Sequence, residues 1–154
     1  MKALVTGGAG YIGSTVSNLL LDNGHQVYII DNLSTGLKKN IPAKATFYKI
    51  DISDKKKIKE ILINENIDIV FHFAAFIDNA ESLRYPKKYF DNNFKKGKIF
   101  FETCIENKLN KFIYSSTAAV YANSAKKISE KSLLKPASPY SISKLKLEKF
   151  LNKK

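Results

Sequence analysis

Short apolar runs alternate with longer amphipathic segments along the chain. Five of these runs contain β-branched or aromatic residues and few polar ones, and they lie at residues 2–6, 26–30, 46–50, 68–74 and 111–115. A strand that is apolar nearly throughout is covered on both of its faces, as the strands of a parallel sheet are. The runs therefore predict a buried parallel sheet of about five strands.

The segments between the runs repeat their apolar residues at helical spacing. They predict a helix over residues 12–22, a second helix capped by Asp54, a long third helix opened by Pro86, and a last helix over residues 141–151. The apolar residues that we expect to form the buried face of the first helix are Ile12, Val16, Leu19 and Leu20. Because strands and helices alternate, the chain is predicted to be one α/β domain over residues 1–154, a doubly wound parallel sheet of Rossmann type.

Three glycines follow the first predicted strand, in the sequence Thr6-Gly7-Gly8-Ala9-Gly10-Tyr11-Ile12-Gly13. Gly7 suits a tight turn out of the strand, Gly10 a close approach of the backbone to a pyrophosphate, and Gly13 a helix that sits close on the sheet. The amino end of the helix would then offer the N–H groups of Tyr11 and Ile12 to the phosphates. A strand before the loop and a helix after it are the context that a dinucleotide-binding motif requires.

Asp31 ends the second predicted strand. A carboxylate at this place accepts hydrogen bonds from the hydroxyls of an adenosine ribose and repels a 2′-phosphate, which predicts NAD rather than NADP as the cofactor. The alternative is an aspartate that caps the turn at Asp31-Asn32.

Tyr140 and Lys144 lie four residues apart in Tyr140-Ser141-Ile142-Ser143-Lys144, so that on a helix they share one face. A free tyrosine has a pKa of about 10 and is a weak base at neutral pH. A neighbouring lysine cation, together with a positive nicotinamide, favours the phenolate and so suits Tyr140 to proton transfer. Lys144 can also bond the nicotinamide ribose. The alternative is a pair of unrelated surface residues.

Hydroxyl residues follow the fifth predicted strand, in Ser115-Ser116-Thr117. The carboxyl ends of the strands face the ligand crevice in a sheet of this type. A hydroxyl there can bond the reacting oxygen and relay its proton to Tyr140, and Thr117 is the candidate for this role. Alternatively, these hydroxyls satisfy backbone groups at the strand exit.

Charge does not point to a nucleic-acid partner. The chain of 154 residues has a net charge of +12, but its lysines are scattered and Arg84 is its single arginine, whereas proteins that read bases favour arginine. One cysteine, Cys104, cannot form an internal disulfide, and no run approaches the ~20 apolar residues that cross a bilayer. We therefore expect a cytoplasmic protein with no specific nucleic acid and no membrane as partners. His25 and His72 are expected to be structural, without a metal.

Several stretches together resemble the extended short-chain dehydrogenase/reductase family, and within it the sugar-nucleotide 4-epimerases. They follow the order and spacing of the family over nearly the whole chain. The matching stretches are residues 5–13, 31–36, 51–52, 72–75, 81–82, 89–93, 115–121 and 138–144. Two positions depart from the usual pattern: Ala122 replaces a glycine, and Gly97 comes one residue later than the glycine of the long helix, so that Lys96 needs a route to solvent.

The resemblance implies a site for NAD. The residues that it assigns to the adenosine diphosphate half are Gly7, Gly10, Tyr11, Ile12, Gly13, Asp31, Asn32, Leu33, Ser34, Thr35 and Gly36, with Asp51 and Ile52 beside the adenine. It places Phe73, Ala74 and Ala75 under the cofactor. The residues that it places at the nicotinamide end are Asn92, Thr117, Tyr140 and Lys144, of which the last three are the catalytic candidates.

The resemblance also implies a reaction. The Tyr140 phenolate would remove the 4-OH proton of a UDP-sugar as hydride passes from C4 to NAD, and the 4-keto intermediate would turn over before hydride returns, which interconverts UDP-glucose and UDP-galactose. Sugar-nucleotide 4,6-dehydratases are also similar, but they need a carboxyl acid beside the threonine, where this chain has Ala118 and Ala119. Dehydration is therefore disfavoured.

Members of the family are longer and carry a substrate domain after the NAD-binding half. We expect a truncated protein without that domain, whose UDP-sugar substrate would bind only if a second half were supplied. An uncovered fifth strand would make the protein a marginal monomer or one that self-associates through this edge. Three hypotheses stay open: a 4-epimerase, an inactive NAD-binding remnant, and a basic binding module.

Overall fold

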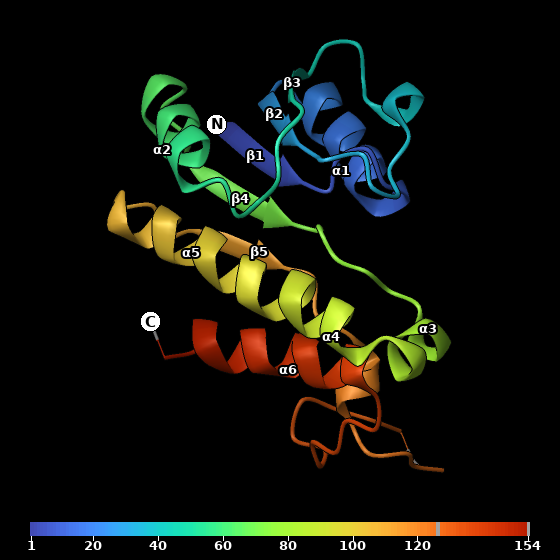
Figure 1. The fold of residues 1–154 in the computed structure, drawn as a ribbon. Helices are drawn as coiled ribbons and strands as arrows, with labels where there is room; N and C mark the ends of the chain where they lie inside the picture. The colour runs from blue at the N-terminus through green and yellow to red at the C-terminus, as the bar shows by residue number, and fades with distance from the viewer. Residues whose placement is uncertain (126, 154) are drawn as a thin grey trace. The chain divides into compact units, whose positions relative to one another are not determined.

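Five parallel strands form one sheet in the order β3-β2-β1-β4-β5 (Figure 1). The computed structural model describes residues 1–125 and 127–153. The strands are β1 (Lys2–Thr6), β2 (Gln26–Ile30), β3 (Thr46–Tyr48), β4 (Ile69–His72) and β5 (Phe112–Tyr114). The predicted parallel sheet of Rossmann type is thereby confirmed, with β3 and β5 at its two edges.

The last three strands are shorter than predicted. After β3 the chain turns, because the Ile50 N–H donates to Tyr48 O at 3.1 Å instead of extending the ladder. The first two strands match the prediction at both ends, since a glycine loop and Asp31 stop them.

The helices are α1 (Tyr11–Asp22), α2 (Lys55–Asn64), α3 (Asn79–Arg84), α4 (Pro86–Tyr89), α5 (Gly97–Glu106) and α6 (Pro139–Leu151), with a π-helical segment η2 (Phe90–Lys96) and two 3-10 turns, η1 (Lys38–Asn40) and η3 (Ala118–Val120). Asp54 caps α2 as predicted, since its side chain accepts the Lys57 N–H. The helical segment that Pro86 opens is long, as predicted, but its middle is π-helix. Helix α3 has no counterpart in the prediction, and Asp78 caps it by accepting the Glu81 N–H at 2.9 Å.

Both faces of the sheet are covered by helices. Alternate residues of each strand point to opposite faces, so residues from each strand contribute to both faces. On one face His72 of β4 stacks on Phe100 of α5, with ring centroids 5.4 Å apart, and its Nδ1 lies 2.9 Å from Thr6 Oγ1. On the other face a buried cluster joins α1 to the sheet; its members are Ala3, Val5, Leu20, Val27 and Ile29. Helices on both sides of the sheet thus explain why the strands are mostly apolar, and the polar His72 and Thr6 pair with each other.

The buried face of α1 differs from the prediction. Of the four apolar residues expected there, Leu20 is buried, but Ile12 and Leu19 are 54% and 63% exposed. The other buried residues of the helix are small: Gly13, Ser14 and Ser17. Small side chains let the helix approach the sheet and the preceding loop closely, and this close approach decides which face of the helix is buried.

Ser17 tests this packing. Its hydroxyl is buried and has no hydrogen-bond partner among the described residues, and a buried hydroxyl without a partner opposes folding. Ser17→Ala is therefore expected to raise the free energy of unfolding by about 1 kcal/mol in urea denaturation. Thr15→Ala, which removes an exposed hydroxyl bonded to Tyr11 O, is the matched control. A destabilised Ser17→Ala variant would show that the hydroxyl has a partner.

The chain forms two compact units. The first unit comprises Met1–Ala75 and Ile99–Ser115 and contains the whole sheet with α1 and α2. The second comprises Phe76–Lys98 and Ser116–Lys154 and contains α3, α4, η2 and α6. Within the second unit, α6 packs against α3, α4, η2 and η3. The candidate site residues therefore fall into two groups, one in each unit.

Candidate active site

The glycine loop between β1 and α1 has the backbone geometry that its sequence predicts. Gly7 adopts a φ of +72°, and a Cβ on it would lie 2.7 Å from the backbone nitrogen of Ala74, so no other residue fits this turn without strain. A Cβ on Gly13 would lie 2.2 Å from Gly7 O. Gly13 therefore lets the helix pack on the loop itself, whereas the sequence predicted a close approach to the sheet.

Gly10 is the N-cap residue of α1, and no side chain of the described residues caps this end of the helix. The first hydrogen bond of the helix runs from Ser14 N–H to Gly10 O at 3.0 Å. A Cβ on Gly10 would meet Gly7 O at 3.3 Å as its one neighbour within 4 Å among the described residues. The amino end of a twelve-residue helix is thus left open beside the loop, where its N–H groups and its dipole favour an anion.

Asp31 joins the loop to the end of β2. The carboxylate is buried, and its Oδ2 accepts the Ala9 N–H at 3.0 Å while its Oδ1 accepts the Leu33 N–H at 2.8 Å. Leu33 has a φ of +60°, a left-handed conformation that brings its N–H back to the carboxylate. The turn-capping role that the sequence left open is therefore present. It does not exhaust the carboxylate, whose two oxygens can accept about four hydrogen bonds.

The other candidates of the first unit gather around this loop. Asn32 Nδ2 donates to Asp51 Oδ2 at 3.0 Å, and the N–H of Ser34 donates to Asn32 Oδ1 at 2.9 Å. A Cβ on Gly36 would lie 2.7 Å from Ala9 Cβ, so the loop over residues 33–36 lies against the glycine loop. Ile52 is buried beside Asp51.

The segment after β4 also reaches the glycine loop. The N–H of Phe73 donates to Thr6 O at 3.0 Å, and the N–H of Ala74 donates to Thr6 Oγ1 at 3.4 Å. The structure thus brings together the candidates of the first unit at the carboxyl ends of β1, β2 and β4. Two further residues belong to this group: Ala9 through its backbone N–H, and Thr6 through its carbonyl oxygen and its hydroxyl. Their residue types did not mark them as site candidates in the sequence.

Tyr140 and Lys144 both lie on α6 in the second unit. Ser138 begins the helix: its hydroxyl accepts the Ser141 N–H, and the Ser141 hydroxyl accepts the Ser138 N–H. Tyr140 therefore stands in the first turn, and Lys144 follows one turn later on the same face. Lys144 is 4% exposed, and its burial lowers the pKa of its ammonium group to about 8.

Thr117 and Asn92 both make local hydrogen bonds. Thr117 Oγ1 accepts the Ala119 N–H at 3.2 Å and so caps η3, which is the backbone role that the sequence left open. This bond leaves the hydroxyl proton for a second partner. Asn92 Nδ2 donates to Asn93 Oδ1 at 3.0 Å. Asn93 is the more deeply buried of the two asparagines, and the sequence prediction did not select it.

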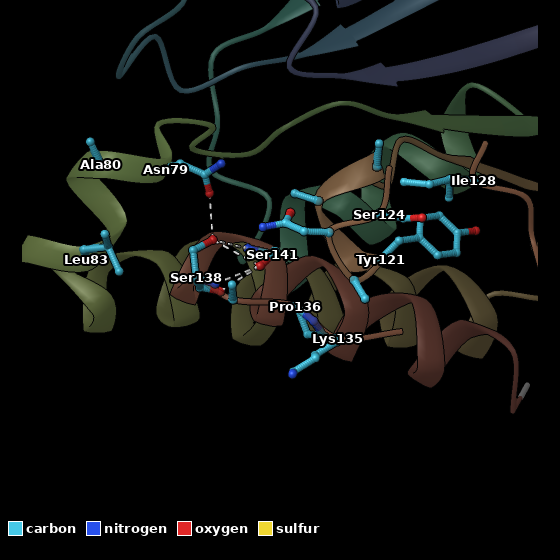
Figure 2. A pocket seen from close by; sticks show the side chains of 15 residues that line it. Asn79, Ala80, Leu83, Tyr121, Ser124, Ile128, Lys135, Pro136, Ser138 and Ser141 are labelled. Atoms are coloured by element: carbon cyan, nitrogen blue, oxygen red, sulfur yellow. Dashed lines mark hydrogen bonds between the residues drawn. The ribbon is translucent and has the colours of Figure 1, made fainter. Parts of the chain in front are cut away.

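A pocket of about 970 Å³ lies in the second unit, between α3, the segment after η3 and the amino end of α6 (Figure 2). Its walls include Ala118 and Ala119, and Ser138 Oγ donates to Asn79 Oδ1 at 2.6 Å beside it. Among the described residues that line it, Lys135 is the one that carries a charge. The described part of its lining therefore offers hydroxyl and amide groups and no carboxylate.

The burial of Lys144 gives a pH-dependent prediction. Because the pKa falls from 10.5 to about 8 on folding, the unfolded chain binds more protons between these two values. The free energy of unfolding should therefore rise with pH over this range, by about 3 kcal/mol in all. Below pH 8 both states are charged and the full cost of burying the cation remains.

In Lys144→Met the rise in the free energy of unfolding between pH 8 and pH 10.5 is expected to be absent. Below pH 8 the variant should be more stable than the unsubstituted chain. Urea denaturation at intervals between pH 7 and pH 10.5 measures the difference. Lys149→Met, on the exposed side of the same helix, is the control that should leave the pH profile unchanged. An equal rise in Lys144→Met would contradict the prediction.

The fold and the first group of residues define a class of protein. A parallel sheet in the order β3-β2-β1-β4-β5, with a glycine loop before α1 and an acidic residue after β2, is the arrangement of dinucleotide-binding proteins of Rossmann type. The NAD dependent epimerase/dehydratase family matches residues 3–153. The chain belongs to this family, whose cofactor is NAD, and the resemblance seen in the sequence is thereby confirmed.

Individual relatives agree with this assignment. The UDP-glucose 4-epimerase of Lactobacillus helveticus is 40% identical over 152 residues, which are 98% of this chain and 46% of that protein. The structure of the UDP-Glc/GlcNAc 4-epimerase from Campylobacter jejuni is 40% identical, with a TM-score of 0.93, over 99% of this chain and 48% of that one. The UDP-glucose 4-epimerase from Brucella ovis, in complex with NAD, is 33% identical, with a TM-score of 0.95, over 99% of this chain and 47% of that one. The chain spans about half the length of these relatives.

Within residues 1–125 and 127–153, no helix has both the length and the apolar character that a membrane crossing requires. In the same part of the chain, no three His, Cys, Asp or Glu side chains are grouped so that they could hold a metal ion.

Proposed function

We propose that this chain binds NAD and supplies the proton-transfer residues of a UDP-glucose 4-epimerase. The observation that carries the proposal is the bond from the Ala9 N–H to the Asp31 carboxylate, 3.0 Å long, which fixes the open end of α1 beside an acidic residue. The identity of 40% to a UDP-glucose 4-epimerase over 98% of the chain supports the choice of substrate.

The first unit fits the adenosine diphosphate half of NAD. The uncapped amino end of α1 would hold the pyrophosphate through the N–H groups of Tyr11 and Ile12, because Gly10 leaves space there that a Cβ would fill. Asp31 has acceptor positions left for the ribose hydroxyls. The residues proposed around the remaining parts of this half are Asn32, Leu33, Ser34, Thr35, Gly36, Asp51, Ile52, Phe73, Ala74 and Ala75.

The second unit would supply the proton transfer. Tyr140, as the phenolate, would take the proton of the sugar 4-OH and return it after the ketone has turned over. Lys144, whose pKa of about 8 leaves it mostly charged at neutral pH, would stabilise the phenolate from one helical turn away. Thr117 would donate its hydroxyl proton to the reacting oxygen, because its hydrogen bond to the Ala119 N–H uses only the hydroxyl oxygen. Bound NAD supplies the chemistry of accepting a hydride from the sugar C4 and giving it back.

Two other candidates remain. Sugar-nucleotide dehydration needs an acid beside the threonine, and the pocket walls there are Ala118 and Ala119, so this reaction is disfavoured. A protein that binds NAD without turning over a sugar nucleotide is the other candidate, and it shares the proposed NAD site of the first unit.

Two measurements on the purified chain separate these candidates. Fluorescence titration with NADH should show saturable binding, and no binding at high micromolar NADH would overturn every NAD-based proposal. Conversion of UDP-galactose to UDP-glucose, followed by a coupled assay, is then expected under the epimerase proposal. NADH binding without conversion would favour the second candidate, and conversion would exclude it.

Asp31→Asn tests the carrying observation. An amide has one acceptor oxygen, so the variant loses one of the two backbone bonds and the charge that orders the ribose. NADH binding should weaken about 10- to 100-fold in the fluorescence titration. Asp22→Asn, an exposed aspartate at the end of α1, is the control. Unchanged NADH affinity in Asp31→Asn would contradict the proposed site.

A further inference from the structure

Tyr89, at the end of α4, is a fully buried tyrosine that none of the proposed roles uses. Its side chain is 0% exposed, and its hydroxyl donates to Glu81 Oε2 at 2.7 Å. The second oxygen of Glu81 accepts a bond from Lys88 Nζ, also at 2.7 Å. Burial and the Glu81 carboxylate raise the pKa of Tyr89 to about 12, so its hydroxyl remains a donor at neutral pH. The tyrosine is thus held in one orientation by a charged partner.

The ring of Tyr89 meets the ring of Tyr140 edge to face. The ring centroids are 6.4 Å apart and the planes are inclined by 83°. Tyr89 also contacts Phe76, with ring centroids 5.8 Å apart. Lys88 Nζ lies over the Phe76 ring, 4.4 Å from its centroid. Edge-to-face pairs at these distances are attractive and directional. The Tyr89 ring therefore limits where the Tyr140 ring can turn.

The backbone of Tyr140 is anchored in the same neighbourhood. Ser143 Oγ donates to Tyr140 O at 2.6 Å, and Asn93 Nδ2 donates to Ser143 Oγ at 3.4 Å. The Asn93 amide also pairs with the backbone of Phe76, accepting its N–H and donating to its carbonyl, each at 2.9 Å. One set of contacts therefore fixes the main chain of Tyr140, and a second set, through Tyr89, fixes its ring.

We propose that Tyr89, oriented by Glu81, is a positioning residue for Tyr140. The inference rests on the proposed function, because a fixed orientation of the Tyr140 ring matters only if Tyr140 transfers a proton. Proton transfer requires the phenol oxygen within hydrogen-bond reach of the sugar hydroxyl, and a misplacement of about 1 Å can cost 100-fold in rate. Main-chain anchoring alone leaves the ring free to rotate about its side-chain bonds, so a contact to the ring itself is needed.

Nuclear magnetic resonance of the full chain, labelled at its eight tyrosines, tests the contact without requiring turnover. The Tyr140 ring signal is assigned by its loss in Tyr140→Phe. In Tyr89→Leu this signal should move toward the position of an exposed tyrosine and narrow, because the neighbouring ring current is lost and the ring becomes mobile. Tyr85→Leu, which removes a tyrosine that is 58% exposed in the adjacent segment, is the matched control and should leave the signal in place.

The hydrogen bond to Glu81 is tested by a second pair of variants. Glu81→Gln keeps an acceptor oxygen for the Tyr89 hydroxyl and should preserve the Tyr140 signal, whereas Glu81→Leu and Tyr89→Phe remove the bond and should shift it. If Glu81→Gln preserves the signal and Glu81→Leu does not, the hydrogen bond that orients Tyr89 is required, and the volume of the side chain at position 81 is not sufficient. If Tyr89→Leu does not fold, Glu81→Leu and Tyr89→Phe decide the result. An unmoved Tyr140 signal in these folded variants overturns the proposal.

Turnover gives the functional readout. With UDP-galactose, Tyr89→Leu should lower kcat about 10- to 100-fold and leave KM within about twofold, since the substrate contacts remain. Equal loss in Tyr85→Leu, or a change confined to KM, would overturn the positioning role. Absence of turnover in the unsubstituted chain would contradict the proposed function, and the resonance comparison would then decide the contact between Tyr89 and Tyr140 by itself.

Discussion

Gly13→Ala is expected to lower the free energy of unfolding by about 3 kcal/mol and to weaken NADH binding more than tenfold. The added Cβ would lie 2.2 Å from Gly7 O and 2.8 Å from Gly8 Cα, both of them backbone atoms that cannot rotate away. The loop must therefore move, and with it the N–H groups proposed to hold the pyrophosphate. Urea denaturation and fluorescence titration with NADH measure the two effects.

Gly10→Ala is the informative comparison. A Cβ at this position would lie 3.3 Å from Gly7 O, and the Gly10 φ of −81° suits any residue. Its stability should change by less than about 1 kcal/mol, while NADH binding is lost because the methyl group fills the space beside the phosphates. Equal destabilisation by the two substitutions would show that Gly10 is kept for folding rather than for binding.

Tyr140→Phe is expected to abolish the conversion of UDP-galactose, with kcat lowered about 100- to 10,000-fold, and to leave NADH affinity within twofold. The variant keeps the ring that packs against Tyr89, so the fold is unchanged, but it has no oxygen to accept the sugar proton. The coupled assay and the NADH titration measure the two quantities on the same preparation.

Tyr85→Phe serves as the control for Tyr140→Phe, since it removes a hydroxyl from an exposed tyrosine of the same unit. Residual turnover in Tyr140→Phe at more than a tenth of the unsubstituted rate would assign the proton transfer to another group. A large loss of NADH affinity would place the Tyr140 hydroxyl in cofactor binding instead.

The arrangement of the strands could be predicted because it depends on local signals. Runs of apolar residues show that β1 and β2 are buried on both faces, and Gly7 and Asp31 show where they end. The buried face of α1 could not be predicted from apolar spacing. It depends on Gly13 and Ser17, whose small size matters only because the glycine loop and the sheet come close to them.

Helix α3 and the π-helical segment η2 also escaped prediction, for different reasons. The six residues of α3 are too few to show a helical period, and its cap, Asp78, reads equally well as part of a loop. The π-helical turns of η2 have no sequence signal of their own, and the pairing of its Asn93 with the backbone of Phe76 joins residues seventeen positions apart.

The sequence could nominate site candidates where a single residue would act through its own functional group. The carboxylate of Asp31, the phenol of Tyr140 and the ammonium group of Lys144 each indicate a possible role by their chemistry. Tyr89 and Asn93 were missed because their roles arise from contacts between α4 or η2 and α6, which join residues about fifty positions apart in the sequence.

The two backbone bonds that Asp31 accepts have a consequence for changing the nucleotide that this fold prefers. A basic residue introduced to bind a 2′-phosphate has no acceptor atom, and it would leave the backbone N–H groups of Ala9 and Leu33 without theirs. Because a buried amide without an acceptor is costly, the selectivity for the coenzyme and the rigidity of its cradle are linked through one side chain. Engineering toward the phosphorylated coenzyme would therefore require a second substitution that replaces the lost acceptor.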